Sequence, residues 1–269
     1  VFPQAIGMAA SWDNELLQEV FDVASTEQRI KFSIAREGDG VQRYHGLSVW
    51  TPNINIFRDP RWGRGMETYG EDPYLTGQLG MAVVRGLQGR RDGETIKAMA
   101  CAKHYALHSG PEWSRHSFDA VASERDVWET YLPAFKDLVT KAMVDQVMFA
   151  YNRMFGFPAG ANERFMRDIL EKEWGFEGIV VSDCWAVTDS YDGHKWSKSR
   201  AEAVATAVKT GMDLECGAAM PAIPKAIKDG LITEEELNEA FRLSEKEFRF
   251  SIRLLPALNI PMDDLCKAL

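Results

Sequence analysis

Ile179-Val-Val-Ser-Asp183 is a short apolar run that ends on a carboxylate, and it decides how the rest of the chain is interpreted. Several similar runs lack a strict alternation of apolar and polar residues, which is typical of strands buried on both faces of a parallel sheet. We therefore predict that these runs are neighbouring strands of one sheet. The other runs are Leu47–Ile56, Ala98–Ala102, Gln146–Tyr151 and Met212–Leu214.

Longer stretches with helical periodicity separate the apolar runs. In Asn14–Arg36, apolar residues recur at close to the period of an α-helix. Strand and helix alternate at least four times along the chain, which favours an α/β fold. The same periodicity occurs in Asp72–Leu87, Glu124–Ala142, Glu163–Glu173 and Ala201–Lys209, and Thr233-Glu-Glu-Glu opens a further helix with a capping-box pattern.

Two α/β architectures fit this alternation, a (β/α)8 barrel and an open doubly wound sheet. An open sheet that binds a dinucleotide is expected to carry G-x-G-x-x-G after its first strand, and the sequence has neither this motif nor a P-loop. The length of 269 residues suits one barrel of roughly 250 residues. We predict an incomplete TIM-barrel-like domain over residues 1–253 and a C-terminal tail over residues 254–269.

The composition excludes several classes of protein. Hydrophobic residues make up 45% of the chain and charged residues 26%, as in ordinary globular domains. A net charge of -9 gains little from counterion release on nucleic acid, so we expect no such partner. No apolar run approaches the roughly 20 residues that a membrane-spanning helix needs, so we expect no membrane span.

The four cysteines, at positions 101, 184, 216 and 266, have neither metal-knuckle nor C-x-x-C spacing. We therefore predict free, buried thiols. This pattern leaves the compartment undetermined. It is periplasmic or extracellular if a signal peptide was removed, and otherwise cytoplasmic.

Polar and aromatic side chains follow each predicted strand. In α/β barrels and open α/β sheets the chemistry gathers at the carboxyl ends of the strands, so we expect these side chains to form a site. The segments in question are Arg58–Asp72, Lys103-His104, Tyr151-Asn-Arg153, Asp183-Cys-Trp185 and Glu215.

Asp183 has two interpretations from its position alone. A carboxylate at a strand end can attack the anomeric carbon of a sugar as a nucleophile. Trp185 would then stack on a sugar face, and Arg64, Lys103 and His104 would donate hydrogen bonds to hydroxyl groups. Alternatively, Asp183 caps the helix that follows it. The sequence does not choose between them.

His108 and His116 share a loop with His104, which suggests a metal site, but the adjacent Arg115 would repel a cation.

The remaining polar and aromatic residues have structural interpretations. In Arg58–Asp72, a salt-bridge network is the simplest explanation, in which Glu67, Glu71 and Asp72 pair with Arg58, Arg61 and Arg64. Asp72 is also placed to cap the helix that begins at Pro73. We predict that Trp128 and Trp174 are core residues, whereas Trp113 lies in a loop and is a candidate ligand contact.

Several separated motifs, taken in order, closely resemble the catalytic barrel of glycoside hydrolase family three. The resemblance covers roughly residues 1–217. The segment Lys103–His116 is similar to the β-xylosidase and β-glucosidase branch. The motifs are Gly63-Arg-Gly-Met-Glu67, Gly70-Glu-Asp-Pro73, Ala102-Lys-His104, Met148-Phe-Ala-Tyr-Asn152 and Val181-Ser-Asp183.

The resemblance implies a role for each matching position. Asp183 matches the catalytic nucleophile. Family members retain the anomeric configuration through a covalent glycosyl-enzyme, which requires two carboxyl groups about 5–5.5 Å apart and neither cofactor nor metal. Lys103 and Arg64 near Asp183 would favour its ionised form. The residues that match the first sugar subsite are Arg64, Lys103, His104 and Tyr151, with Trp185 and Arg115 as further substrate contacts.

The sequence also departs from the family. A first helix, an early strand and the Asp that binds distal sugar hydroxyls are not matched, so we expect a barrel truncated at both ends. In most branches the acid/base Glu lies in a second domain, and Glu215 is a positional candidate only. The β-N-acetylglucosaminidase branch uses a loop His instead, for which His116 is the test residue.

We therefore expect a retaining β-glycosidase, an exo-acting β-xylosidase or β-glucosidase that releases non-reducing-end sugars from β-linked oligosaccharides through a glycosyl-Asp intermediate. The alternative is an inactive or sugar-binding barrel fragment that lacks the acid/base domain, and a β-N-acetylglucosaminidase is less favoured. Exposed sheet edges in an incomplete barrel favour self-association or docking of a missing C-terminal domain. The sequence does not distinguish a preference for xylose from one for glucose, and it does not give the oligomeric state.

Overall fold

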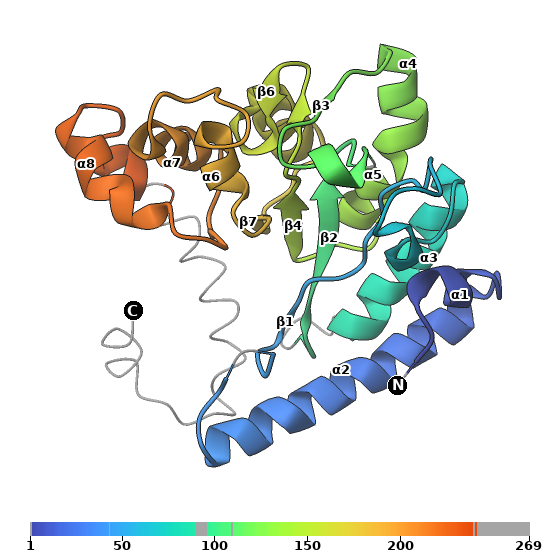
Figure 1. Cartoon of the computed structure of the whole chain (residues 1–269). Coiled ribbons are helices and arrows are strands. Elements are labelled where there is room, and N and C mark those ends of the chain that lie inside the picture. The colour runs from blue at the N-terminus through green and yellow to red at the C-terminus, as the bar shows by residue number, and fades with distance from the viewer. Residues whose placement is uncertain (1, 43, 90–95, 109, 239, 241–269) are drawn as a thin grey trace.

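The computed structural model describes residues 2–42, 44–89, 96–108, 110–238 and 240. The predicted tail over residues 254–269, the last part of the predicted domain and Cys266 lie outside the described residues. The centre of the fold is a four-stranded parallel sheet with the order β1-β2-β4-β7 (Figure 1). Its strands are β1 (Ser48–Val49), β2 (Met99–Tyr105), β4 (Gln146–Phe149) and β7 (Ile179–Ser182).

The strands pair in a register that brings their carboxyl ends to one edge. Gln146 to Phe149 of β4 lie opposite Ile179 to Ser182 of β7. Isolated bridges from Asn53 to Lys103 and from Val181 to Leu214 continue the parallel pairing at the two sides of the sheet.

The two outer runs form less regular strand than predicted. Within Leu47–Ile56 only β1 is a strand, and Pro52 interrupts the run because proline has no N–H to donate to a neighbouring strand. Leu214 makes a single bridge to Val181, so Met212–Leu214 is not a strand.

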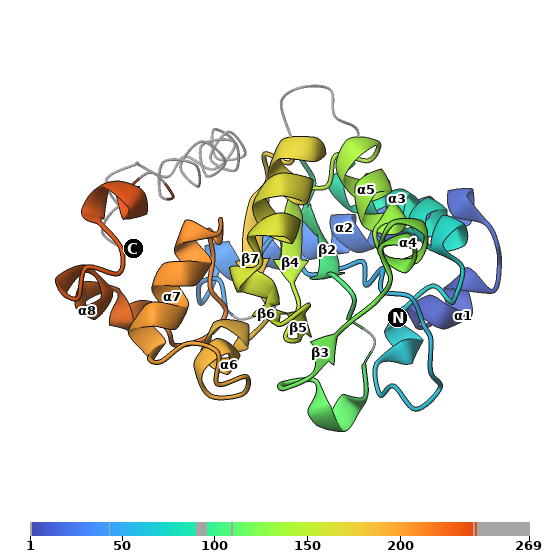
Figure 2. The same ribbon diagram turned by 90° about the horizontal axis from the view of Figure 1, so that it is seen from above.

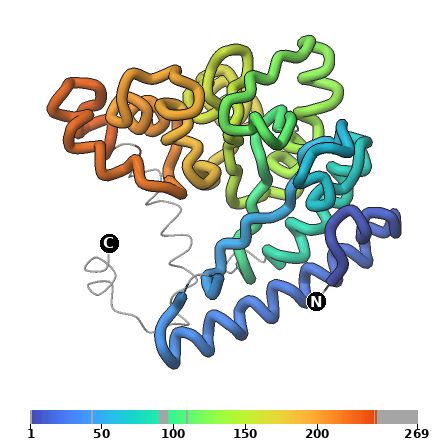
Figure 3. Tube along the Cα trace, in the orientation of Figure 1, coloured from blue at the N-terminus to red at the C-terminus, as the bar shows by residue number. Residues whose placement is uncertain are grey.

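Helices cover the sheet as the periodicity predicts (Figures 1 and 2). The long helix α2 packs against α3, and α3 packs against α5. Figure 3 shows that the N-terminal helices and the α6–α8 segment lie toward opposite sides of the sheet. The α-helices are α1 (Ala5–Ala9), α2 (Asn14–Glu37), α3 (Pro73–Gln88), α4 (Glu124–Asp126), α5 (Pro133–Thr140), α6 (Ala186–Tyr191), α7 (Arg200–Lys209) and α8 (Ile223–Lys228).

Capping side chains fix where several helices begin. Asp72 accepts a hydrogen bond of 2.6 Å from the Leu75 backbone N–H, as predicted, and so starts α3. The capping box predicted at Thr233 is present, because Thr233 and Glu236 each accept a bond from the other's backbone N–H.

Two predicted helices contain π-helical segments, Val127–Tyr131 and Arg164–Glu173. The first lies between α4 and α5, so the predicted helix over Glu124–Ala142 is not one continuous α-helix.

A small second sheet, absent from the sequence prediction, lies beyond the carboxyl ends of the central strands (Figure 1). Its strands are β3 (Asp119–Ala120), β5 (Arg153–Met154) and β6 (Phe157–Pro158), in the order β3-β5-β6. The four central strands do not close on themselves in the described part of the chain. The predicted α/β class with an incomplete barrel is therefore confirmed.

The core lies between the central sheet and its helices, around fully buried aromatic side chains such as Tyr105, Phe135 and Phe149. Trp174 belongs to this core, as predicted. The prediction for Trp128 is wrong, because its side chain is 37% exposed on a short π-helical turn. Within the described ranges, no helix is both long and apolar enough to cross a bilayer.

The prediction of free thiols is wrong for two of the cysteines. Cys184 and Cys216 form a disulfide with their Cα atoms 4.4 Å apart. They are 32 residues apart in the sequence, but the bridge between Val181 and Leu214 brings the two segments side by side. Among the described residues, Cys101 forms no disulfide and is buried, as predicted.

Candidate functional site

The predicted sugar-binding side chains come together at the carboxyl edge of the central sheet. Lys103 and His104 belong to β2, Tyr151 follows β4 and Asp183 follows β7. Arg64 reaches the same place from the loop after β1 and hydrogen bonds to His104. Five of the seven predicted residues therefore surround one point, although they are spread over 120 positions of the sequence.

The two carboxylate oxygens of Asp183 differ in their hydrogen bonding. Its Oδ1 accepts a hydrogen bond of 2.8 Å from the Cys184 backbone N–H. Its Oδ2 is buried and has no hydrogen-bond partner among the described residues, and it lies 3.6 Å from His104 Nε2. Helix α6 begins at Ala186 without any side-chain cap, so the alternative that Asp183 caps this helix is wrong.

Burial raises the pKa of Asp183, because a desolvated carboxylate loses the hydration that stabilises its charge. The Cys184 N–H, the charges of Arg64 and Lys103 and the Tyr151 hydroxyl all lower the same pKa, but together they do not outweigh burial. The expectation that the two cations favour the ionised form is right in sign. It is incomplete, because the sequence does not reveal how deeply Asp183 is buried.

Arg64 is held by a two-pronged contact with Glu67. Its Nε donates to Glu67 Oε1 at 2.8 Å, and its Nη2 donates to Oε2 at 2.7 Å. Burial alone would lower the pKa of Arg64 and raise that of Glu67, but the ion pair reverses both shifts. The third nitrogen, Nη1, lies 3.1 Å from His104 Nε2. Glu67 thus fixes the plane of the guanidinium group.

The other two arginines of the predicted salt-bridge network, Arg58 and Arg61, have partners other than the predicted ones. Arg61 pairs with Asp59 at 2.6 Å, and Arg58 donates to the Tyr131 hydroxyl. Of the predicted carboxylate partners, Glu67 is the one that joins the site, and Asp72 serves as a helix cap. Sequence reasoning therefore missed that Glu67 is part of the candidate site.

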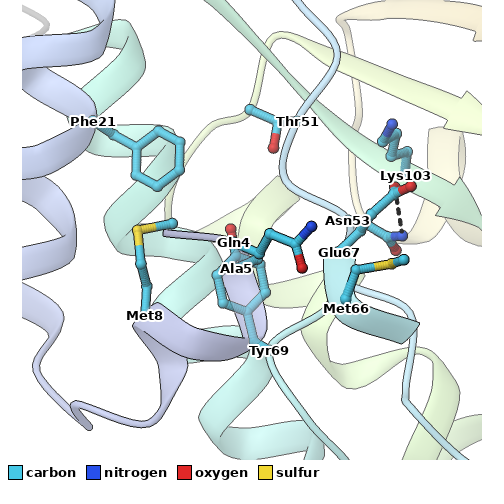
Figure 4. Close-up of a pocket in the computed structure, with 10 residues that line it drawn as sticks. All are labelled: Gln4, Ala5, Met8, Phe21, Thr51, Asn53, Met66, Glu67, Tyr69 and Lys103. Carbon is cyan, nitrogen blue, oxygen red and sulfur yellow. Dashed lines mark hydrogen bonds between the residues drawn. The ribbon is translucent and has the colours of Figure 1, made fainter. Parts of the chain in front are cut away.

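A pocket of about 370 Å³ lies next to Glu67 and Lys103 (Figure 4). Its polar side includes these two residues and Asn53, whose amide donates to Glu67 Oε2 at 3.5 Å. Met8 and Phe21 line the opposite, apolar side. Burial lowers the pKa of Lys103, and the nearby carboxylates of Glu67 and Asp183 oppose this shift.

Two buried histidines lie beside each other, with their ring centroids 4.7 Å apart. His104 Nδ1 lies 2.9 Å from Asn55 Oδ1, and His108 Nδ1 lies 3.0 Å from Asn152 Oδ1. Burial, together with the neighbouring cations, lowers the pKa of His104 well below its usual value, and burial lowers that of His108 to about 4. Both rings are therefore neutral near pH 7.

Arg115 and His116 enclose Tyr151. The guanidinium carbon of Arg115 lies 5.3 Å from the centre of the Tyr151 ring, and the His116 ring centre lies 4.5 Å from it. His116 Nδ1 contacts Asp189 at 2.6 Å, and Arg115 donates from Nε to His116 Nε2 at 3.3 Å. Arg115 thus belongs to the rim of the site through Tyr151.

The exposed aromatic residues have different positions. Trp185 follows Cys184 directly, has a φ of 74° and is 55% exposed. It stands at the edge of the site, next to the disulfide. Trp113 is 88% exposed on the turn Glu112–Ser114, so it is not enclosed by the site. Glu215 accepts hydrogen bonds from the backbone N–H groups of Ala219 and Met220, and both of its oxygens take part.

No set of three or more His, Cys, Asp or Glu side chains within the described ranges is arranged to hold a metal ion. His108 and His116, the two residues that raise this idea from sequence, have separate partners in Asn152 and Asp189. The described site consists of Asp183 with its free oxygen, the ion pair of Arg64 and Glu67, a second cation in Lys103, two neutral imidazoles and a tyrosine.

The comparisons with known proteins identify the family of the chain. Residues 1–243 match the model of the glycosyl hydrolase family 3 N-terminal domain. The chain is 50% identical over 254 residues to a xylan 1,4-beta-xylosidase from Xylanibacter ruminicola, a match that covers 92% of this chain and 29% of the relative.

Two solved structures share the fold. A GH3 exo-beta-xylosidase in complex with a xylobiose aziridine activity-based probe has a TM-score of 0.85 and 32% identity, and the match covers 94% of this chain and 32% of that one. A β-glucosidase from Listeria innocua has a TM-score of 0.78 and 29% identity, covering 99% and 36%. The chain spans about a third of the length of these proteins.

The motifs that suggest the family are the segments that form the site. Gly63–Glu67 contributes Arg64 and Glu67, and Ala102–His104 contributes Lys103 and His104. Val181–Asp183 contributes the free carboxylate oxygen. The family match covers nine-tenths of the chain, and the fold agrees with it at high similarity. The chain belongs to glycosyl hydrolase family 3.

Proposed function

We propose that this chain carries the nucleophile and the sugar-gripping side chains of a retaining β-glycosidase. The enzyme is an exo-acting β-xylosidase or β-glucosidase that releases non-reducing-end sugars from β-linked oligosaccharides. The observation that carries the proposal is the free, buried Oδ2 of Asp183. Arg64 and Lys103 supply charge beside it. The relative that is 50% identical is named a xylan 1,4-beta-xylosidase, which supports xylose as the leading sugar.

The reaction follows from this geometry. Asp183 Oδ2 attacks the anomeric carbon, and a C–O ester bond forms as the glycosidic C–O bond breaks. The departing oxygen takes a proton from an acid, and water later attacks the glycosyl-Asp to restore the carboxylate. Oδ2 has no partner within hydrogen-bond geometry among the residues that the structure describes, which leaves it available to attack. In this mechanism Arg64, Lys103, His104 and Tyr151 hold the sugar in the first subsite.

Glu215 and His116 are the positional candidates for the acid/base. Both oxygens of Glu215 accept backbone hydrogen bonds, which disfavours this residue as a proton shuttle. His116 Nε2 accepts from Arg115, so it carries no proton toward a substrate in this arrangement, and a β-N-acetylglucosaminidase mechanism is not favoured. These contacts favour, as a second candidate function, a sugar-binding barrel that forms the glycosyl-Asp but turns over slowly.

Hydrolysis of p-nitrophenyl β-xyloside and β-glucoside tests the proposal, because the nitrophenolate anion is stable enough to depart without a proton from an acid. We expect hydrolysis by the wild-type chain, faster for the xyloside, and none by Asp183→Ala. Mass spectrometry after treatment with a 2-fluoro-xyloside should show one sugar on Asp183. Labelling without turnover would favour the sugar-binding barrel. A chain that is neither labelled nor active would contradict the proposed nucleophile.

A further inference from the structure

The side chain of Asn55 makes three hydrogen bonds with a single residue of the site. Its Nδ2 donates to the His104 backbone carbonyl at 2.8 Å, and its Oδ1 accepts from the His104 backbone N–H at 2.8 Å. The same Oδ1 lies 2.9 Å from Nδ1 of the His104 ring. Asn55 is almost fully buried between Ile54 and Ile56, so these contacts are protected from competition by water.

These contacts fix the orientation of the carboxamide. A backbone carbonyl only accepts hydrogen bonds and a backbone N–H only donates them. A flipped Asn55 would point its NH₂ at the His104 N–H and its oxygen at the His104 carbonyl, which breaks both bonds. Oδ1 therefore faces the imidazole, and as a pure acceptor it requires a proton on Nδ1.

The proton on Nδ1 decides what the other ring nitrogen does. The His104 ring is neutral, so its Nε2 carries a lone pair rather than a proton. Arg64 Nη1 lies 3.1 Å from Nε2 and donates to it. In the other tautomer, an Nε2–H would face Arg64 and would also lie 3.6 Å from Asp183 Oδ2, close to donor distance from the attacking oxygen.

We propose that Asn55 is a positioning residue of the glycosidase site, which sets the His104 tautomer so that Nε2 holds Arg64 and leaves Asp183 Oδ2 without a donor. This inference rests on the proposed function for its catalytic consequence. Asn55 touches neither the nucleophile nor a reacting atom, and it acts through His104.

Two variants and a matched control separate positioning from general stability. Asn55→Ala removes all three contacts, and Asn55→Asp keeps the two accepting contacts while adding charge. Asn162→Ala is the control, because Asn162 is also buried and its amide donates to the Met154 carbonyl, with no contact to His104. The assay is the rate at which a dinitrophenyl 2-fluoro-xyloside labels Asp183, followed by mass spectrometry over a range of pH.

We expect Asn55→Ala to label roughly 100-fold more slowly, as small misplacements of catalytic groups can, and Asn162→Ala to label within about twofold of wild type. In Asn55→Asp the added carboxylate stabilises protonated His104, so the acid limb of the labelling profile should move to higher pH. An unchanged rate in folded Asn55→Ala, or an unmoved profile in Asn55→Asp, would overturn the proposal.

A spectroscopic readout stays valid even if the chain is not labelled. Long-range ¹H–¹⁵N NMR of histidine rings distinguishes the two tautomers, and a His104→Gln variant assigns the His104 signal. We expect a protonated Nδ1 in the wild type and a mixture of tautomers in Asn55→Ala. A protonated Nε2 in the wild type would refute the assignment. A wild type that is not labelled but has the expected tautomer would contradict the proposed function and leave the role of Asn55 toward His104 supported.

Discussion

Removing the disulfide between Cys184 and Cys216 should weaken both the fold and the site. Cys184 directly follows Asp183, and Cys216 directly follows Glu215. The two segments are also joined by hydrogen bonds, because Trp185 N–H donates to the Cys216 carbonyl at 2.6 Å and Cys216 N–H donates to Ser182 Oγ at 2.8 Å. The double variant Cys184→Ser/Cys216→Ser removes the covalent link and leaves these hydrogen bonds in place.

The magnitude follows from the length of chain that the disulfide closes. For a separation of 32 residues, the chain-entropy relation gives about 3.7 kcal/mol at 25 °C from the lost freedom of the unfolded chain. A protein of this size loses roughly 2–4 °C of melting temperature per kcal/mol, so we expect a drop of about 7–15 °C. Labelling of Asp183 by the 2-fluoro-xyloside should also slow, because the next residue becomes free to move.

Urea unfolding and thermal melting, followed by circular dichroism with and without reductant, measure the effect. Reductant should lower the wild-type midpoint to that of the double variant and leave the double variant itself unchanged. Cys101 is buried and forms no disulfide with a described cysteine, so a Cys101→Ser variant reports the effect of replacing a buried cysteine outside this disulfide. A wild-type midpoint that does not respond to reductant would refute the reasoning, because it would mean that the bond is not formed.

Three further predictions concern single side chains. Burial raises the pKa of Asp183 above its unfolded value, so the folded state loses stability as the pH rises from the unfolded pKa through the folded pKa. The stability of Asp183→Asn relative to wild type should therefore grow as the pH rises above the unfolded pKa, and a urea-midpoint difference independent of pH would contradict this. A Cβ on Gly160 would lie 2.6 Å from the Phe149 ring, so Gly160→Ala should cost about 1–3 kcal/mol in urea unfolding, whereas Gly46→Ala, with open space around it, should be nearly neutral. Arg64→Lys keeps the charge but loses the planar fork, so labelling of Asp183 should slow by at least tenfold, and a rate equal to wild type would show that charge alone suffices.

The sequence predicted the elements that have a long or strongly periodic pattern. The run before Asp183 and the run before Lys103-His104 are strands, because apolar residues without alternation suit strands buried on both faces. The second strand continues through Lys103 and His104, which were predicted to follow it. The helix at Asn14 was predicted to begin at the residue where it does. The strands of the second sheet were missed, since two residues such as Arg153-Met154 carry no period.

The parts of the site that depend on proximity were not predictable from one sequence. The disulfide joins residues with an uninformative spacing, and only the adjacency of the strands makes the pairing evident. Asn55 did have a signal, a polar residue between two isoleucines in an apolar run, which marks a buried side chain that needs partners. The net pKa of Asp183 required its burial, which no local pattern reports.

The two carboxylate oxygens of Asp183 have different surroundings, and this difference fixes which of them the proposed nucleophile presents to a substrate. A free carboxylate is symmetric, and a half-turn about its Cβ–Cγ bond exchanges its two oxygens. Here that half-turn would break the 2.8 Å bond between Oδ1 and the Cys184 N–H. In the proposed mechanism the covalent bond to the sugar therefore forms at Oδ2, and the same oxygen is released when water attacks the anomeric carbon from the opposite face. Retention itself results from two successive inversions at the anomeric carbon, and the torsion of Asp183 fixes, before any substrate arrives, which oxygen would take part in both.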